Sequence, residues 1–511
     1  MTDSAIKHIT TIFPVDAEAL KPNVQPSRRR SIIREFSLNT TAHGIPGIAR
    51  SKSIPNRIFW TISTLVFTGI LLYFVIESVK GYFSYPSQTL ISSSQEWPLV
   101  FPAVTICNYS PLRFDLFMKP FLNYTNSLNL TNSNDTTRIT RIQASYIRDF
   151  FQYKLNRGES LNEYFFSLSS MLISCFYNEL KCSKDDFTPF VSYLYGLCYT
   201  FNAKNKKIRN GSLFLNSDNG ALGLLSLQLY THSHQYVPYL SDASGIVGMI
   251  HDNAEIPLAF QKENVFAPGK KHRLNFSKRK NMFLGPPYTQ CRSDIPPMLQ
   301  STYRLVGDTD YVYSEFQYFY VCLQTYTYVT CGCLNPDFWS IKYVVLNNST
   351  EPITTVPLCN LTDSCYKTAT DRFQLDEELY DTYCPGQTPI CSSTKFDTRV
   401  SLLSAPSPWM MDYIKEFVNS SNVPLPKNWE ETWRTEIQNS YVAIDVACEA
   451  IIVESTEQSA SLTFVDLISN IGGHTGLWIG ISFLSLMELI EMFYRLLRYH
   501  GYLLRRRIEG E

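Results

Sequence analysis

Oxygen-bearing side chains near the C-terminal end of the chain occur in a stretch that is otherwise apolar. The 20 residues of Ile468–Met487 contain no Lys, Arg, Asp or Glu, which matches the length and polarity of a membrane span. Ser482 and Ser485 lie within this stretch, and Glu488 and Glu491 follow it. Carboxylates within a span are costly and usually face a bundle interior or a water-filled path. The pattern therefore predicts that these groups face a bundle interior or a water-filled path.

The spacing of these four groups also predicts an irregularity in the helix. They are three residues apart, and at about 100° per residue each step drifts by about 60°. Together they cover about half of a helix, which is too wide for one narrow face. Either the helix breaks, or some of the groups face neighbouring helices. Glycines precede them at Gly472, Gly473, Gly476 and Gly480. Glycine suits a break in the helix, and close packing of helices is the alternative explanation for these glycines.

A second uncharged run of 19 residues, Ile58–Ile76, lies near the other end of the chain. Arginines and lysines flank both runs on their outer sides, so the positive-inside rule places both termini in the cytoplasm and the middle outside, at the plasma membrane. The expected order is a cytoplasmic N-terminus (1–56), a first span (57–78), an extracellular domain (79–463), a second span (464–494) and a cytoplasmic tail (495–511).

The central region carries two extracellular signatures. All 13 cysteines lie between the spans, as an oxidising compartment favours. Glycosylation sequons are also dense there. They occur at Asn108, Asn123, Asn129, Asn134, Asn210, Asn275, Asn347, Asn348, Asn360 and Asn419. The net charge of −1 gives no indication of a nucleic-acid partner.

The fold class predicted for the central region is α+β. Alternating or β-branched segments predict strands, and amphipathic segments predict helices. Strands are expected at 101–107, 212–215, 223–232 and 439–454, and helices at 141–155, 371–383 and 405–418. The polar N-terminus is expected to be disordered until about His43. Its "RRRS" around Ser31 suits a basic membrane anchor or a kinase site.

The cysteines predict a disulfide-stapled subdomain. The "CGC" at Cys331 and Cys333 cannot easily bond to itself across one residue, so its partners must come from nearby cysteines. A zinc site is the alternative, but no His lies among these cysteines. An odd total leaves at least one thiol unpaired or paired between chains.

An ordered set of motifs resembles the degenerin, epithelial sodium channel and acid-sensing ion channel family. The resemblance runs from His43 to about Glu491. The motifs are "HG" at 43–44, "FPAVTICN" at 101–108, "GLCYTFN" at 196–202, "APG" at 267–269, "GPPYTQC" at 285–291, "CGC" at 331–333 and "IGGHTGLWIGIS" at 471–482.

The resemblance implies an amiloride-sensitive, sodium-selective channel, built as a homotrimer or as a heterotrimer with related subunits in a lipid bilayer. Its extracellular domain would contain palm, β-ball, finger, thumb and knuckle parts. No enzyme activity, cofactor or metal is implied. The activating stimulus stays open between a peptide ligand, protons and mechanical force.

The family's cysteine pattern implies six disulfides: Cys107–Cys198, Cys175–Cys182, Cys291–Cys391, Cys322–Cys384, Cys331–Cys365 and Cys333–Cys359. Two further cysteines of the acid-sensing branch fall on Tyr318 and Gly386 here. Those two positions would bond each other, so both partners are missing together. Cys448 is left as the odd thiol, and burial as a small hydrophobe is favoured over reactivity.

The resemblance also implies functional positions. Gly480, Ile481 and Ser482 match the selectivity belt, and Glu488 and Glu491 would form carboxylate rings. Pairing of Glu491 with Arg495 at i+4 is the alternative for Glu491. Gating positions would be His43, Gly44, Tyr85, Tyr288, Ile451, Ile452 and Ser469. The alternatives are ordinary packing for Tyr85 with Tyr288, and burial in a strand for Ile451 and Ile452.

Signals for proton or metal sensing are weaker. Asp376, Glu377, Glu378 and Asp381 could raise one another's pKa, although a solvated helix face is favoured. Pro86 stands where the acid-sensing branch often has His, which argues against direct proton gating. The His232-x-His234 pair could bind a metal, but two His on a strand face are expected in solvent. Competing classes are a non-conducting adhesion or receptor protein, an ATP-gated receptor and an ectoenzyme, for which no motif is present.

Overall fold

The computed structural model describes residues 27–220, 222–257, 263–306, 311–342, 344, 346, 353 and 356–508. The chain forms two compact units. The first, which we call the terminal unit, comprises Met1–Ser87 together with Ala460–Glu511. The second, the central unit, comprises Gln88–Ser459. Each is described by itself, and the sequons at Asn347 and Asn348 lie outside the described residues.

The long helix of the terminal unit is α3, Ile54–Phe83, which has 30 residues. Among the described residues it is the one helix that is long and apolar enough by itself to cross a membrane. The predicted first span, 57–78, lies inside it. Two shorter helices, α14 (Phe464–Ile479) and α15 (Phe483–Ile508), meet at a 77° bend and meet the same criterion only when taken together as one broken span.

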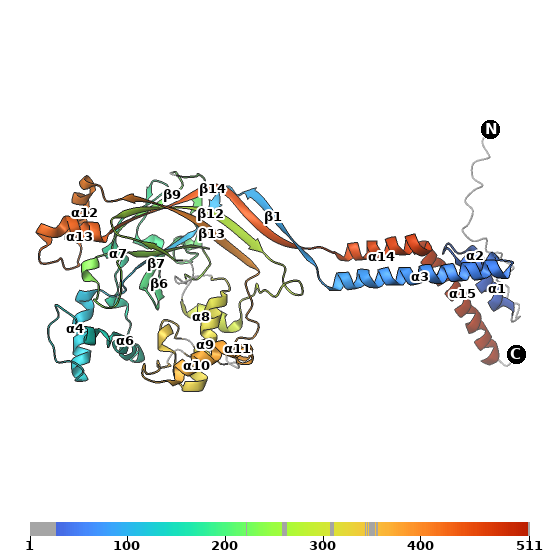
Figure 1. Ribbon diagram of the computed structural model, residues 1–511, viewed down its shortest axis with the longest axis horizontal. Helices are drawn as coiled ribbons and strands as arrows, with labels where there is room; N and C mark the ends of the chain where they lie inside the picture. Colours follow the sequence, from blue (N-terminus) through green and yellow to red (C-terminus); the bar gives the residue numbers. More distant parts are fainter. Residues whose placement is uncertain are drawn as a thin grey trace. The chain divides into compact units, whose positions relative to one another are not determined.

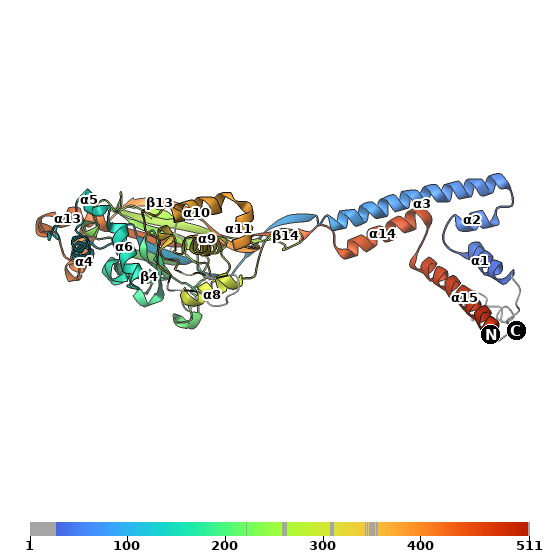
Figure 2. The same cartoon turned by 90° about the horizontal axis from the view of Figure 1, so that it is seen from below.

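Helix α14 lies beside α3 within this unit (Figures 1 and 2). It begins with a capping box, in which Thr463 and Asp466 satisfy each other's backbone N–H groups. Aromatic stacking joins the two helices, because Trp478 stacks on Phe67 and Phe74 at centroid distances of 6.1 and 5.8 Å. One side of α14 is therefore fixed against α3.

The N-terminal segment is more ordered than its composition predicts. Residues 27–39 form α1 (Ser27–Asn39) and residues 45–50 form α2 (Ile45–Arg50). Helix α1 packs on α15 and α2, and α2 packs on α3. The expected disorder up to about His43 is therefore wrong for residues 27–43. Tertiary contacts stabilise a helix whose polar sequence alone would not, and Ile32 is buried there.

Two β-sheets form the body of the central unit (Figure 1). The larger has the order β13-β12-β14-β9-β4-β5, with β1 also pairing with β14. Its strands are β1 (Ser87–Gln95), β4 (Leu172–Tyr177), β5 (Leu180–Lys181), β9 (Leu224–Tyr230), β12 (Lys270–Met282), β13 (Ser392–Ser404) and β14 (Tyr441–Ala460). The smaller has the order β11-β10-β3-β7-β6. Its strands are β3 (Ala103–Asn108), β6 (Phe187–Ser192), β7 (Gly196–Phe201), β10 (Ile246–His251) and β11 (Asn264–Phe266). A separate two-stranded pair joins β2 (Leu99–Val100) to β8 (Leu215–Asn216).

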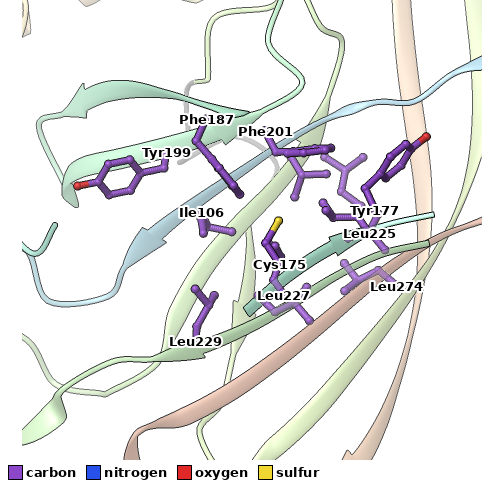
Figure 3. Packing of buried hydrophobic residues seen from close by; sticks show 14 of the residues in the cluster. Ile106, Cys175, Tyr177, Phe187, Tyr199, Phe201, Leu225, Leu227, Leu229 and Leu274 are labelled. Carbon is purple, nitrogen blue, oxygen red and sulfur yellow. The ribbon is translucent and has the colours of Figure 1, made fainter. Parts of the chain in front are cut away.

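The main hydrophobic core lies between the two sheets (Figure 3). Ile106 and Phe201 from the smaller sheet meet Leu225, Leu227 and Leu274 from the larger one, and all five are almost fully buried. Each such side chain stabilises the fold by about 1.5–3 kcal/mol. Strand alternation directs every second residue of β9 into this core.

Helices surround the sheets in three groups. The first contains α4 (Phe114–Ser127), α5 (Arg141–Ala144), α6 (Ile147–Asn156) and α7 (Leu168–Met171). The second contains α8 (Pro297–Val306), α9 (Glu315–Cys331), α10 (Cys365–Leu375) and α11 (Glu377–Tyr383), and the third contains α12 (Pro408–Ser420) and α13 (Trp429–Ser440). The first two groups have their own aromatic cores, such as Phe117, Phe121 and Phe150 in the first. An α+β central region is therefore present.

Some predicted elements differ from the observed ones. The helix expected at 371–383 is split into α10 and α11, because Asp376 accepts a hydrogen bond from the Leu379 N–H and caps a new helix. The helix expected at 141–155 is split into α5 and α6. Of the strand expected at 212–215, only the end enters the short strand β8. The strands expected at 101–107, 223–232 and 439–454 correspond to β3, β9 and β14.

Six disulfides stabilise the central unit, and they join the same pairs that the family pattern implies. Tyr318 is buried, and its hydroxyl donates to the carbonyl of Pro385, which directly precedes Gly386. Among the described residues the free cysteine is Cys448, which is buried. Its Sγ donates to the Ala450 carbonyl at 3.2 Å, and burial raises the pKa of the thiol to about 11.

We expect peptide mapping under non-reducing conditions to recover these six bridges and an unmodified Cys448. In the folded protein Cys448 should resist maleimide, because its thiol is buried and protonated. In denaturant it should react fully. Finding Cys448 in a bridge would contradict the prediction and also the paired loss of cysteines at Tyr318 and Gly386.

Candidate ion-permeation site

The C-terminal helix of the terminal unit breaks at the glycine-rich stretch. Helix α14 ends at Ile479, and Gly480, Ile481 and Ser482 are not helical before α15 begins. Gly480 has φ 64° and ψ 25°, a left-handed conformation that suits glycine. The N–H of Gly480 still donates to the Gly476 carbonyl, so the turn closes the helix in an orderly way.

The loop between α1 and α2 lies against this break. The His43 N–H donates to the Ile479 carbonyl at 2.9 Å, which satisfies a group that the broken helix would leave without a partner. A Cβ added at Gly480 would lie 2.7 Å from Cγ of His43. Gly480 is therefore required twice, by its backbone angle and by the imidazole beside it.

The same loop binds the polar groups that follow the break. The Thr40 hydroxyl and the Thr41 N–H both donate to Oε2 of Glu488 at 2.9 Å. The Thr41 Oγ1 lies 2.6 Å from Oγ of Ser485. Ser485 in turn accepts from the Ser482 N–H at 3.1 Å. A continuous hydrogen-bonded chain thus runs from the loop through Ser485 to the end of the break.

Glycines bring this loop close to α3. Gly44 has φ 93°, and a Cβ there would lie 2.4 Å from Oγ1 of Thr64. A Cβ on Gly47 would lie 2.6 Å from the Trp60 ring. The glycine of the His-Gly pair is therefore explained by a close approach to α3, while its histidine contacts the break. The pair holds the loop between two helices.

Glu491 and Arg495 do not form the simple i+4 contact considered for them. The Arg495 guanidinium instead binds both oxygens of Glu35 on α1 at 3.3 Å. This ion pair joins α1 to α15 at a point C-terminal to the break. Glu491 is partly buried on the same helix, and its role in a pore stays a prediction.

The two faces of α14 have opposite characters. His474 and Trp478 stack on α3. Successive residues lie about 100° apart on a helix, so the stripe on the opposite side contains Ser469, Gly472, Gly473 and Gly476. A Cβ added at Gly472, Gly473 or Gly476 would meet no other described atom within 4 Å. Nothing described within the single chain explains these three glycines.

The remaining gating positions belong to other elements of the chain. Tyr85, at the end of α3 with φ 49°, belongs to the terminal unit, whereas Tyr288 belongs to the central unit. Their expected contact stays a prediction. On β14, Ile451 packs against the main core, while Ile452 is 55% exposed.

The candidate sensor residues of the central unit are structural or solvated. Asp376 caps α11, and Glu377, Glu378 and Asp381 are exposed, as a solvated helix face predicts. The expectation that His232 and His234 lie in solvent is wrong for His232, which is fully buried where the strand ends in a left-handed turn. Burial lowers the pKa of His232 to about 3. No cluster of three or more metal-binding side chains is found among the described residues.

The central unit also contains a cavity of about 350 Å³ that reaches the surface. Its walls come from α6, from the turn between β6 and β7, and from the segment after α9. Aromatic and leucine side chains together form most of the wall, with Phe151, Phe165, Tyr193 and Trp339 among the aromatic ones, and an ion pair between Arg148 and Asp337 lies beside them.

The described sequons differ in accessibility. Asn123, Asn129, Asn134, Asn210, Asn360 and Asn419 are exposed, and Asn275 is partly buried. Asn108 is only 2% exposed, and its amide donates to the Thr231 carbonyl. Asn108 is therefore not available for glycosylation in this fold.

Sequence reasoning missed several residues of this site. Thr40 and Glu488 are 448 positions apart, and nothing in either local sequence links them. The same holds for Glu35 with Arg495. The available signal was only the position of two threonines shortly before the His-Gly pair, separated from it by Ala42.

We expect Gly480→Ala to disrupt the terminal unit. The left-handed angle and the 2.7 Å approach of His43 would each be strained, at a combined cost of about 1–3 kcal/mol. Gly69→Ala on α3 is the matched control, because an added Cβ there meets no other described atom within 4 Å. The thermal midpoint of the detergent-solubilised protein should fall for the first variant only. Equal midpoints would show that the break does not depend on this contact.

The chain is similar in sequence to known ion channels. The family model described as "Amiloride-sensitive sodium channel" matches residues 36–492, which include the loop, the break and Glu488. Acid-sensing ion channel 1C of Danio rerio is 26% identical over 92% of this chain and 85% of its own length. Acid-sensing ion channel 1 of Gallus gallus is 25% identical over 91% and 84%, and the bile acid-sensitive ion channel of Mus musculus is 23% identical over 93% and 90%. A solved proton-activated chloride channel aligns with a TM-score of only 0.28 at 7% identity, covering 86% of this chain and 98% of that one, and carries no conclusion. The family and these relatives are ion channels and not enzymes. The chain belongs to the amiloride-sensitive sodium channel family.

Proposed function

We propose that three copies of this chain, or this chain with related subunits, form a sodium-selective, amiloride-sensitive channel of the plasma membrane. The observation that carries the proposal is the break at Gly480–Ser482, which the His43 loop supports and which Glu488 follows. Non-helical backbone at membrane depth is tolerated only where it faces protein or water. A helix that only anchored the chain would need no such break.

The order of segments follows from the same proposal. Residues 1–56 and 495–511 are cytoplasmic, α3 provides the first span around 57–78, and 464–494 forms the second span. The extracellular domain is 79–463. The larger sheet is the palm, the smaller sheet the β-ball, α4 to α6 the finger, α9 to α11 the thumb, and α12 with α13 the knuckle.

The trimer gives the free face of α14 its role. Small residues let helices approach closely, and Ser469 with Gly472, Gly473 and Gly476 forms a stripe of small residues opposite α3. In a trimer this stripe faces the central axis. Backbone oxygens of Gly480 to Ser482 and the Glu488 carboxylates then line the path, where oxygen ligands replace part of the water shell of Na⁺.

The stimulus is extracellular in this proposal. The aromatic cavity beside α6 is one place where a small organic or peptide ligand could act, and protons remain the second candidate because curated relatives are named acid-sensing channels. Whole-cell recording from cells that express the chain tests both, during application of peptides, protons and amiloride. A protein at the surface that never passes current under any of these conditions would favour the non-conducting alternative.

We expect Glu488→Gln to weaken sodium selectivity or unitary conductance without preventing surface delivery. The amide keeps the shape and can still accept from Thr40 and Thr41, but it removes the negative charge beside the break. Glu77→Gln is the control, because Glu77 forms an exposed i+3 pair with Lys80 at the far end of α3. An unchanged reversal potential and unitary current in Glu488→Gln would exclude Glu488 from the ion path.

We expect Ser469→Phe to produce a standing amiloride-sensitive current without any stimulus. Overpacking a tight site costs about 1–3 kcal/mol, and three symmetry copies would apply that cost in the closed state. A difference of about 5.5 kcal/mol is enough to invert a 1:99 equilibrium. Ile468→Phe is the control, because it adds a similar ring about 100° away on the helix. Normal surface labelling of Ser469→Phe with no standing current would show that the closed pore does not narrow here.

A further inference from the structure

Strand β14 contains an irregular segment, Glu449–Ile452, which we call the linker. The parallel ladder with β12 pairs Phe276 with Cys448 and resumes only where Lys278 pairs with Val453. The four linker residues therefore stand opposite Ser277 alone. Pairing of β14 with β9 also ends just before the linker, at Ala447. At the linker, therefore, the pairing of β14 with β12 is interrupted and its pairing with β9 has ended, although Glu449 forms an exposed ion pair with Arg399 on β13.

The residue directly after β1 contacts both the linker and strand β12. Glu96 directly follows β1, and its backbone N–H donates to the Ile451 carbonyl inside the linker at 3.1 Å. Its carboxylate accepts from Nζ of Lys278 at 2.8 Å and from Nζ of Lys280 at 2.7 Å, both on β12. We call Glu96, Lys278 and Lys280 the latch.

The latch is more than a surface ion pair. The Lys278 side chain is 8% exposed and that of Glu96 25%. Burial raises the pKa of Glu96, but the hydrogen bonds and charges of the two lysines outweigh it and hold that pKa below its usual value. Removing the carboxylate would leave Lys278 buried without a counter-charge, which is strongly unfavourable.

We propose that Glu96 is a positioning residue that holds the linker in place, so that the part of β14 beyond the linker can shift only when the latch opens. That part ends at Ala460, and α14 begins at Phe464. The effect of this shift on ion conduction rests on the proposed function. The claim that Glu96 positions the linker does not depend on it.

The chain provides its own reporter of linker opening. Cys448 is the residue directly before the linker, it is buried, and its Sγ donates to the Ala450 carbonyl within the linker. The other cysteines are in disulfides. The rate at which maleimide modifies Cys448 under native conditions therefore measures how often the linker opens. The measurement needs no ion current. A negative result would therefore contradict the latch without contradicting the proposal that the protein is a channel.

The experiment compares full-length variants in detergent by mass spectrometry of the Cys448 peptide. Glu96→Gln should increase the labelling rate at least about tenfold, because the neutral side chain no longer compensates Lys278. Glu96→Lys combined with Lys278→Glu should return the rate toward that of the unmodified protein. Lys280→Met, which leaves the bond between Glu96 and Lys278 intact, should give a smaller increase and serves if Glu96→Gln fails to fold.

The control is Glu430→Gln, which makes the same change in an exposed ion pair, that of Glu430 on α13 with Lys415 on α12. It should leave the labelling rate unchanged. Two results would overturn the proposal. One is unchanged labelling in Glu96→Gln, or in Lys280→Met if the first variant does not fold. The other is an equal increase in Glu430→Gln, which would indicate general loosening of the central unit.

Discussion

The terminal unit is organised around one constraint, which is that a helix in an apolar stretch must break without leaving backbone groups unsatisfied. At Gly480 the chain meets this constraint from a distance, because the His43 N–H donates to the Ile479 carbonyl. The contact requires a glycine at 480 for space and a glycine at 44 for the approach to Thr64. Helices α1 and α2 flank that loop and hold it in position, and their contacts with α3 and α15 order a polar N-terminal segment. The ion pair of Glu35 with Arg495 completes the support.

The support and the proposed ion path share residues, and the geometry permits both roles. The bonds from Thr40 and Thr41 to Glu488 both end on Oε2. A carboxylate offers about four lone-pair sites on two oxygens, so Oε1 can still attract a hydrated cation. The same bonds limit the rotamers of Glu488, which makes it a fixed charge rather than a mobile one. Positioning a charge before the ion arrives is what a selective site needs.

The sequence predicts the functional residues whose role can be recognised from their immediate neighbours in the chain, and it fails for those whose partners are distant. Gly480 and Glu488 stand out because a glycine and a carboxylate in an apolar run are unusual where they stand. The cysteines stand out through the family pattern.

Thr40, Glu35 and His232 do not stand out, because their partners are distant in sequence and the residues next to them are ordinary. The helix expected at 371–383 was misjudged for the opposite reason: Asp376 looked like part of a charged face, but its side chain caps a new helix. In the central unit, His232 is buried because a left-handed turn at the end of β9 directs the chain inward, which alternation alone does not predict.

The two irregularities of the chain, the linker in β14 and the break after α14, lie on one continuous C-terminal segment. They belong to different units, the linker to the central unit and the break to the terminal unit. In the terminal unit the His43 N–H binds the Ile479 carbonyl at the interrupted helix, and in the central unit the Glu96 N–H binds the Ile451 carbonyl at the interrupted strand. Each irregularity is thus stabilised by a backbone hydrogen bond from a residue distant in sequence. Such a contact can open locally without disrupting the regular strand or helix next to it.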